Sequence, residues 1–332
     1  MKVLKLDPCE PPLWARGAHR QTILAHLIPS AVLPSKGERI ELLHADGDRS
    51  VAYVARGSSN VVVYLFHGLT GSVDSSYMHR AAALARALEH TVIMVNHRGC
   101  GEGAGLARNP YHSGRAEDLS TAIAWGREKF PKARHVAIGF SLSANALLLL
   151  LGGGRGSEKP DAAIAVNAPI DLEYCSRALT RGLNKIYDFV FVAECKREIN
   201  IRPLSQDERH RYQVPRSSTL FDFDNIYTAP AGGFASREQY YQTCSASPWL
   251  TRIQTPTIIL TAADDPFVGV DIYRTATPSS SVHLHIENTG GHMGYLAKQR
   301  KNARADGPEA RFGVTRWLDQ ALAKGIKALT DV

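Results

Sequence analysis

The sequence predicts an α/β protein in which a mostly parallel central sheet carries helices on both faces and one inserted cap. From residue 60 onward, short runs of consecutive apolar residues alternate with segments of helical periodicity. Continuous apolar strands of this kind are typical of a parallel sheet that is buried on both faces. The alternation is interrupted once, between residues 166 and 256, so one long segment must lie outside the regular succession of strands and helices.

The expected elements follow in order along the chain. The first 35 residues are irregular and contain several prolines, which predicts an arm packed on the body with one short helix at 22–27. Two alternating segments, 39–43 and 50–55, flank an Asp-Gly turn and predict a β-hairpin. The buried strands are then expected at 61–66, 91–95, 136–138, 162–166, 256–261 and 282–286. Helices are expected at 77–88, 117–130, 147–151 and 310–322.

These elements divide the chain into an N-terminal arm (1–35), a core (36–169 and 254–332) and a cap (170–253). The cap holds two helical patterns, at 172–183 and 187–196, and a segment this long inside a compact domain is more often a functional lid than slack chain. Its aromatic side chains line an acyl-binding cavity or form the cap's own small core, and both readings stay open. They are Tyr187, Phe189, Phe191, Phe221, Phe223, Tyr227 and Phe234.

A candidate nucleophile stands where the third parallel strand meets the leucine-rich helix. The segment Gly139-Phe-Ser141-Leu-Ser143 places a serine between two small residues, directly after an apolar strand and directly before a helical pattern. This is the arrangement of a nucleophile elbow, in which small neighbours let the backbone turn sharply and leave the serine hydroxyl exposed. Ser141 is therefore the predicted nucleophile.

An activated serine needs a base and a carboxylate that orients this base, and in such a fold both follow the serine in the chain. Two aspartates, Asp264 and Asp265, come at the end of the strand at 256–261, and we favour Asp265, which directly precedes a proline turn. His292 lies on a glycine-rich loop after the last strand and is the predicted base. The other histidines are weaker candidates: His67, His79, His97 and His112.

The oxyanion that forms on serine attack needs preorganised N–H donors. One is the backbone amide of Leu142 at the start of the helix, and the other is the amide of Leu69 in the loop His67-Gly-Leu-Thr-Gly71 after the first parallel strand. We expect His67 to hydrogen-bond within that loop. The side chains expected near the substrate are His67, Phe189, Phe223 and Met293.

Short motifs spread over nearly the whole chain carry a family resemblance. They are His19-Arg-Gln-Thr22, His67-Gly-Leu-Thr-Gly71, Asn96-His-Arg-Gly-Cys100, Tyr111-His-Ser-Gly114, Glu117-Asp118, Gly139-Phe-Ser-Leu142, Phe223-Asp224, Thr228-Ala-Pro230, Gly233-Phe234, Tyr240-Tyr241, Cys244-Ser245, Asp264-Asp-Pro-Phe267 and Gly290-Gly-His-Met-Gly294. With them the sequence resembles the YheT-like branch of the α/β-hydrolases, which includes bacterial YheT-type hydrolases, eukaryotic esterases and lipases, and yeast medium-chain acyltransferases. The resemblance implies an α/β-hydrolase fold with Ser141, Asp265 and His292 as the catalytic triad. This chain has Ser143-Ala144 where the branch usually has Gly-Gly.

These residues predict a serine hydrolase that cleaves short- to medium-chain carboxylic esters through an acyl-enzyme intermediate. The same residues would serve an acyltransferase that moves an acyl group from a thioester to an alcohol, and a membrane-surface lipase is a further alternative. A non-catalytic binding module is disfavoured because all the catalytic positions are filled. No cofactor is expected, and no metal either, because His67 and His97 lack a recognisable ligand spacing.

Composition bounds the partners and the compartment. The net charge is +7, but the lysines and arginines are spread along the chain, so no nucleic acid is expected and the partner is a small acyl ester. The densest basic run, 298–304, would suit peripheral contact with acidic head groups or a solvated loop. Five scattered cysteines and the lack of a signal-peptide pattern predict a cytoplasmic protein. The oligomeric state stays open.

Overall fold

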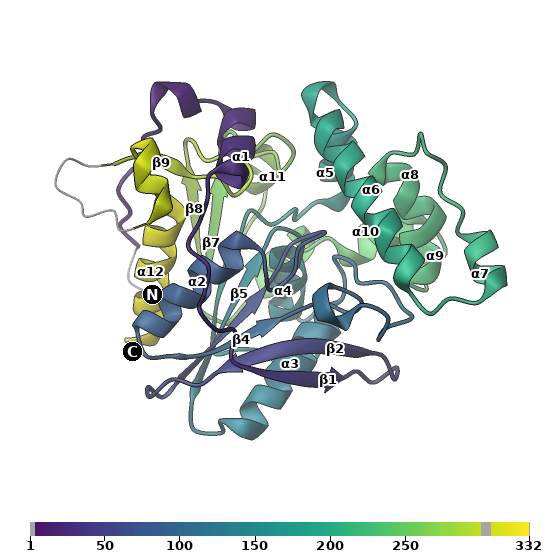
Figure 1. Cartoon of the computed structure of the whole chain (residues 1–332), viewed down its shortest axis with the longest axis horizontal. Helices are drawn as coiled ribbons and strands as arrows, with labels where there is room; N and C mark the ends of the chain where they lie inside the picture. The colour runs from purple at the N-terminus through teal and green to yellow at the C-terminus, as the bar shows by residue number, and fades with distance from the viewer. Residues whose placement is uncertain (1–3, 300–306, 332) are drawn as a thin grey trace.

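The computed structural model of the chain describes residues 4–299 and 307–331. At its centre lies an eight-stranded sheet in the order β1-β2-β4-β3-β5-β6-β7-β8 (Figure 1). The strands are β1 (Glu38–Leu43), β2 (Arg49–Ala55), β3 (Val61–Phe66), β4 (Thr91–Val95), β5 (Arg134–Phe140), β6 (Ala162–Val166), β7 (Thr257–Ala262) and β8 (Val282–Glu287). Strands β3 to β8 run parallel, whereas β1 pairs antiparallel with β2 and β2 with β4. The predicted mostly parallel α/β sheet is confirmed.

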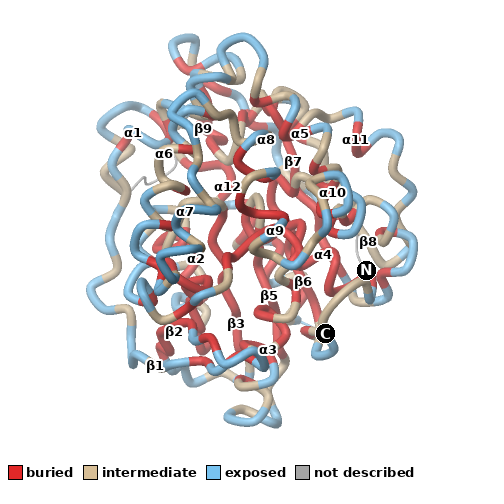
Figure 2. Tube along the Cα trace, turned by 90° about the vertical axis from the view of Figure 1, so that its right-hand side faces the viewer, coloured by how far each residue is buried: buried red, intermediate tan, exposed pale blue. Residues whose placement is uncertain are grey.

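Helices cover both faces of this sheet. Helices α2 (Ser76–Ala87) and α12 (Trp317–Thr330) pack on one face, and α3 (Ala116–Lys129) and α4 (Leu142–Gly152) pack on the other. Successive side chains along each strand point to opposite faces of the sheet and enter two separate buried clusters. Figure 2 shows the buried residues of the strands in red. Helix α4 is buried along almost its whole length because the sheet, α3 and the turn η5 surround it, which explains its run of consecutive leucines.

Between β6 and β7 the chain forms a group of helices that stands beside the sheet, in teal and green in Figure 1. They are α5 (Leu172–Leu179), η3 (Gly182–Asn184), α6 (Lys185–Ile201), α7 (Gln206–Arg211), α8 (Leu220–Phe223), the π-helical turn η4 (Asp224–Thr228), α9 (Ala229–Ala231), α10 (Arg237–Cys244) and η5 (Ser247–Arg252). We call this segment the insertion. Its first helix is shorter than the helical pattern predicted, and its second runs five residues beyond the predicted end at 196.

The N-terminal residues pack against the C-terminal part of the chain. They form the turn η1 (Leu13–Ala15) and helix α1 (Ala18–Leu27), which begins four residues before the predicted start. The buried side chain of Gln21 accepts a hydrogen bond from the backbone N–H of Leu296 at 2.7 Å and donates to the carbonyl of Leu296 at 3.1 Å. These contacts bring the start of the chain to the segment that follows β8.

The end of the chain differs from the expected helix at 310–322. A short turn, η6 (Pro308–Phe312), ends at Gly313 in the left-handed region with φ +67°, and β10 (Val314–Arg316) then pairs with β9 (Leu296–Lys298). Only then does α12 begin. The helix starts late because the backbone around residue 315 forms strand hydrogen bonds instead of helical ones. Two further short elements are η2 (Gly101–Gly103) and α11 (Asp271–Arg274). Residues 300–304 of the basic run lie outside the described residues.

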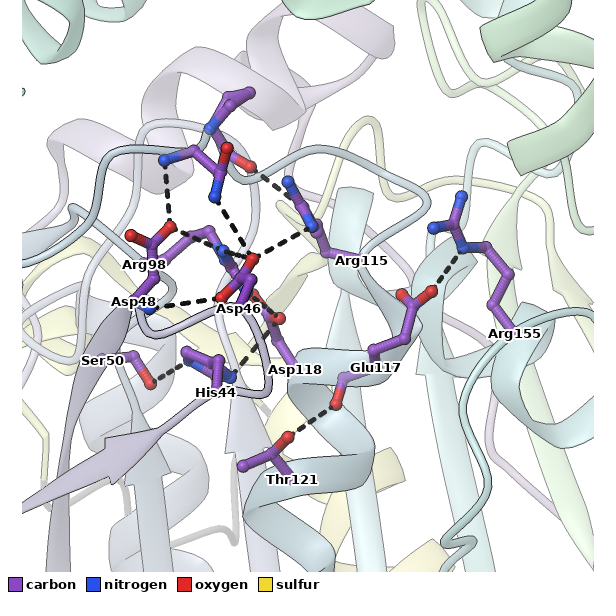
Figure 3. A network of polar contacts seen from close by, with 12 residues as sticks. His44, Asp46, Asp48, Ser50, Arg98, Arg115, Glu117, Asp118, Thr121 and Arg155 are labelled. Atoms are coloured by element: carbon purple, nitrogen blue, oxygen red, sulfur yellow. Dashed lines mark hydrogen bonds and ion pairs between the residues drawn. The ribbon is translucent and has the colours of Figure 1, made fainter. Parts of the chain in front are cut away.

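A buried ionic network ties the β1–β2 turn to α3 (Figure 3). Arg98, which follows β4, is 2% exposed and donates to both carboxylate oxygens of Asp118 at 2.6 and 2.7 Å. Its third nitrogen donates to Asp46 at 2.7 Å and to Asp48 at 2.8 Å. Asp48 in turn accepts from the backbone N–H of Asn109 at 2.9 Å. The network therefore fixes the loop after β4, part of which reaches the site described next.

Candidate active site

Ser141 occupies a sharp turn between β5 and α4. Its φ is +51°, an unusual value for a residue with a side chain, and its N–H donates to the carbonyl of Val166 at 2.8 Å. A Cβ on Gly139 would lie 2.7 Å from the carbonyl oxygen of Ser143 and 2.9 Å from the backbone of Ala144. Only glycine fits at position 139, and the strained serine stands at the carboxyl edge of the sheet, as in a nucleophile elbow.

Three side chains that are far apart in the sequence form a hydrogen-bonded series. Nε2 of His292 lies 2.9 Å from Oγ of Ser141, and Nδ1 of the same ring lies 2.8 Å from Oδ2 of Asp265. The Asp265 side chain is fully buried. Because the carboxylate accepts from Nδ1–H, Nε2 of the neutral ring is left free to accept the serine proton.

The two neighbouring aspartates have different surroundings. Asp265 also accepts from the backbone amides of Phe267 (3.1 Å) and Val268 (2.9 Å). Asp264 turns the other way and accepts from the amides of Gly290 and Gly291, both at 2.8 Å, and burial raises the pKa of its carboxyl. Asp264 thus holds the loop that carries His292, whereas Asp265 contacts the imidazole itself.

Further residues position this arrangement, and the sequence analysis gave them no role. Asn167, directly after β6, donates to Asp265 at 2.7 Å and accepts from the hydroxyl of Tyr295 at 2.9 Å. Thr22, in the N-terminal helix α1, accepts from the backbone N–H of His292 at 2.9 Å. A polar residue at the end of a buried strand could have indicated a role for Asn167 at the site. Thr22 was noted only as part of a motif that carries the family resemblance.

The loop after β3 comes close to the serine. A Cβ on Gly68 would lie 3.2 Å from the Cβ of Ser141. Leu69 and Leu142 line the same cavity as Ser141, and within the described part of the chain neither of their backbone N–H groups has a hydrogen-bond acceptor. Leu142 is the first residue of α4, where amides are free and the helix dipole favours negative charge. Both amides are available to an oxyanion.

The side chain of His67 holds that loop in place through hydrogen bonds on both ring nitrogens. Its Nε2 accepts from the backbone N–H of His97 at 3.1 Å, so Nδ1 carries the hydrogen and donates to the carbonyl of Gly68 at 2.8 Å. Burial lowers the pKa of His67 well below its ordinary value, so the ring is neutral. Ser143, two residues after Ser141, hydrogen-bonds to the carbonyl of His67. This hydroxyl links the elbow to the loop.

A cavity opens at Ser141 between the sheet and the insertion. Of the four side chains predicted near the substrate, Phe223 lines it and the other three do not. Phe189 is 71% exposed, because the opposite face of α6 packs inward through Val192 and Ile199. The side chain of His67 is fully buried, and Met293 packs against the buried cluster between the sheet and helices α2 and α12. The structure corrects these three predictions.

The cavity is less apolar than the aromatic pattern suggested. Phe191, Phe223 and Phe267 line it together with Glu198 and Asp224. Burial raises the pKa of Glu198 to about 7 and that of Asp224 to about 6. The sequence analysis did not predict that Glu198 and Asp224 line the cavity, because the hydrophobic periodicity of a helix does not show whether an acidic side chain points inward or into solvent.

Comparison with known proteins decides the family. The family model described as the alpha/beta hydrolase fold matches residues 61–299. The Putative esterase YheT of Escherichia coli K12 is 32% identical over 289 residues, which cover 84% of each chain. The chain belongs to the YheT-like branch of the α/β-hydrolase family.

Other relatives in this hydrolase family are more distant. A Monoacylglycerol lipase of Saccharomyces cerevisiae is 27% identical, and the match covers 80% of this chain and 61% of the yeast protein. The human Phospholipase ABHD3 is 27% identical over 86% of this chain and 73% of its own length. Among solved structures, an esterase of Pyrococcus furiosus superposes with a TM-score of 0.53 at 16% identity, covering 80% of this chain and 90% of the esterase. That likeness concerns the fold alone.

Proposed function

We propose that this protein is a serine hydrolase that cleaves short- to medium-chain carboxylic esters. The hydrogen-bonded series Ser141–His292–Asp265 at the mouth of a cavity is the observation that carries the proposal. Relatives named as an esterase, a monoacylglycerol lipase and a phospholipase support the same class of reaction. The aromatic part of the cavity suits an apolar acyl chain.

The proposed reaction has two steps. Oγ of Ser141 attacks the ester carbonyl while Nε2 of His292 takes its proton, and the amides of Leu69 and Leu142 donate to the oxyanion. The imidazolium, oriented by Asp265, then protonates the departing alcohol, which leaves an acyl-enzyme. Water, deprotonated by His292, attacks the acyl-enzyme and releases the carboxylic acid and free Ser141.

Replacing the serine tests the proposal directly. In Ser141→Ala we expect the rate of hydrolysis of p-nitrophenyl octanoate to fall on the order of a million-fold, to near background, because no acyl-enzyme can form. A fluorophosphonate should label the wild type and fail to label this variant. Ser113→Ala is the matched control, since this hydroxyl also lines the cavity but bonds the carbonyl of Leu142. Equal rates for Ser141→Ala and wild type would rule out a serine hydrolase.

A second candidate, action at a membrane surface, is favoured by one observation. Exposed apolar side chains occur on η1 and α1 and on η3 and the start of α6, and a 3.0 Å hydrogen bond between His19 and Tyr187 joins α1 to α6. They are Leu13, Trp14, Ile23, Leu27, Leu183, Ile186, Phe189 and Val190. Exposed Arg16, Arg20, Arg181 and Lys185 belong to the same two stretches of the chain, a combination that suits an anionic lipid surface. Tyr187 packs on Phe267, which packs on His292, so this surface borders the site. No helix among the described residues has the length and hydropathy to cross a bilayer.

Vesicle flotation tests this candidate. We expect wild type to float with phosphatidylglycerol vesicles, and the double variant Ile186→Ser, Phe189→Ser to lose roughly nine-tenths of that binding as buried apolar area is removed. Leu43→Ser is the control, because Leu43 is equally apolar and exposed but lies on β1. Wild type that stays at the bottom of the gradient would contradict surface action and leave ester hydrolysis standing.

A further inference from the structure

The cavity that opens at Ser141 has a polar end inside the insertion. Glu198 lies in the last turn of α6, Arg202 directly follows that helix, and Tyr227 lies in the π-helical turn η4. All three line the cavity. A π-helical turn is rare and is often found at a functional site.

Two of these side chains hold polar atoms that have no hydrogen-bond partner in the described part of the chain. Arg202 is 2% exposed and Tyr227 is 3% exposed. Yet among residues 4–299 and 307–331, neither Nε of Arg202 nor the hydroxyl of Tyr227 has a hydrogen-bond partner. The remaining nitrogens of Arg202 donate to backbone carbonyls, including those of Asn109 at 2.6 Å and Arg98 at 3.3 Å, so the guanidinium is held in place. Most buried polar atoms in native proteins are paired, and these two belong to residues that line the cavity, so they can serve as partners for a bound group.

The charges around this end of the cavity select the kind of group. Glu198 is a mostly buried carboxyl whose pKa is raised to about 7 by burial, and its described contact is a weak hydrogen bond from the thiol of Cys100 at 3.8 Å. An anion placed here would meet Glu198, and a cation would meet Arg202. A neutral hydroxyl can accept from the Nε–H of Arg202 and donate to Glu198 or Tyr227, so it satisfies both sides.

We propose that Glu198, Arg202 and Tyr227 form a subsite for a hydroxyl group on an uncharged ester substrate. The subsite rests on the ester hydrolysis proposed above and narrows its substrate class. The hydroxyl can belong to the alcohol part of the ester or to its acyl chain. Both give the same contacts, and different substrates distinguish them.

Three esters of equal acyl length make the test. We measure kcat/KM for propyl octanoate, for glyceryl octanoate with hydroxyls on the alcohol, and for propyl ω-hydroxyoctanoate with the hydroxyl on the acyl chain. In wild type, at least one hydroxylated ester should exceed propyl octanoate about tenfold, because a substrate lacking the hydroxyl leaves buried polar atoms unpaired. The better of the two identifies the part of the substrate that carries the hydroxyl.

Tyr227→Phe should lower this ratio of kcat/KM values severalfold, because it removes one of the two unpaired groups. Glu198→Leu is the second variant, in case the first is unstable, and should do the same. Tyr212→Phe is the matched control: this ring packs on Tyr227 at 5.1 Å but does not line the cavity, so the wild-type ratio should remain.

The subsite is overturned if wild type cleaves both hydroxylated esters no faster than propyl octanoate, or if the ratio is unchanged in both variants. A wild-type enzyme that cleaves none of the three esters and is not labelled by a fluorophosphonate would instead overturn the proposed ester hydrolysis, and the subsite with it.

Discussion

Asp265→Asn should lower kcat for ester hydrolysis about ten-thousand-fold while leaving the fold intact. The asparagine amide would present N–H to Nδ1 of His292, so the ring would be held with its hydrogen on Nε2, the nitrogen that must accept the proton of Ser141. The Asp265 side chain is fully buried and 2.8 Å from Nδ1, so no water can take over its role. Initial rates with saturating p-nitrophenyl octanoate measure the loss.

The neighbouring aspartate provides a matched control. Asp264→Asn keeps a side-chain oxygen that can accept from Gly290 and Gly291, and it does not touch the imidazole. We expect a loss of no more than about tenfold, from weaker hydrogen bonds to the loop. If Asp264→Asn were the more damaging of the two, the assignment of Asp265 as the acid would be wrong.

Arg98→Met should lower the free energy of unfolding by about 3–5 kcal/mol. The substitution keeps much of the apolar stem but removes the guanidinium that contacts Asp46, Asp48 and Asp118. Three carboxylates then face one another without a cation between them. The side chains of Asp48 and Asp118 are only 10% and 7% exposed, so water cannot screen their repulsion well. Urea unfolding followed by circular dichroism measures the change, with the slope of the transition as a check on two-state behaviour.

A surface arginine gives the comparison for this second experiment. Arg108 pairs with Glu208 at 2.6 Å, but its side chain is 57% exposed. Arg108→Met should therefore cost less than about 1 kcal/mol. Equal effects of the two substitutions would show that the buried network contributes no more than a surface ion pair.

The main features of the fold follow from patterns that are local in the chain. Consecutive apolar residues at 61–66 and 162–166 mark strands that are buried on both faces whatever their neighbours are. Gly139 and Ser141 indicate the turn because the backbone atoms that exclude a side chain at position 139 belong to Ser143 and Ala144, which lie within five residues of it. At the C-terminus the same reasoning was wrong, because the residues after Gly313 pair with the distant strand β9 and delay α12.

The parallel sheet, the sharp turn at Ser141 and the chain order of serine, aspartate and histidine could be predicted from the sequence, because each depends on neighbouring residues or on chain order. The folded structure was needed to show that Asp265 faces the imidazole while Asp264 holds the loop, that Thr22 and Asn167 position His292 and Asp265, and that Glu198 lines the cavity while Phe189 faces solvent. Those outcomes depend on the direction of single side chains and on contacts between separate segments of the chain, such as the contact between Thr22 and His292, which lie 270 residues apart. No local pattern encodes them.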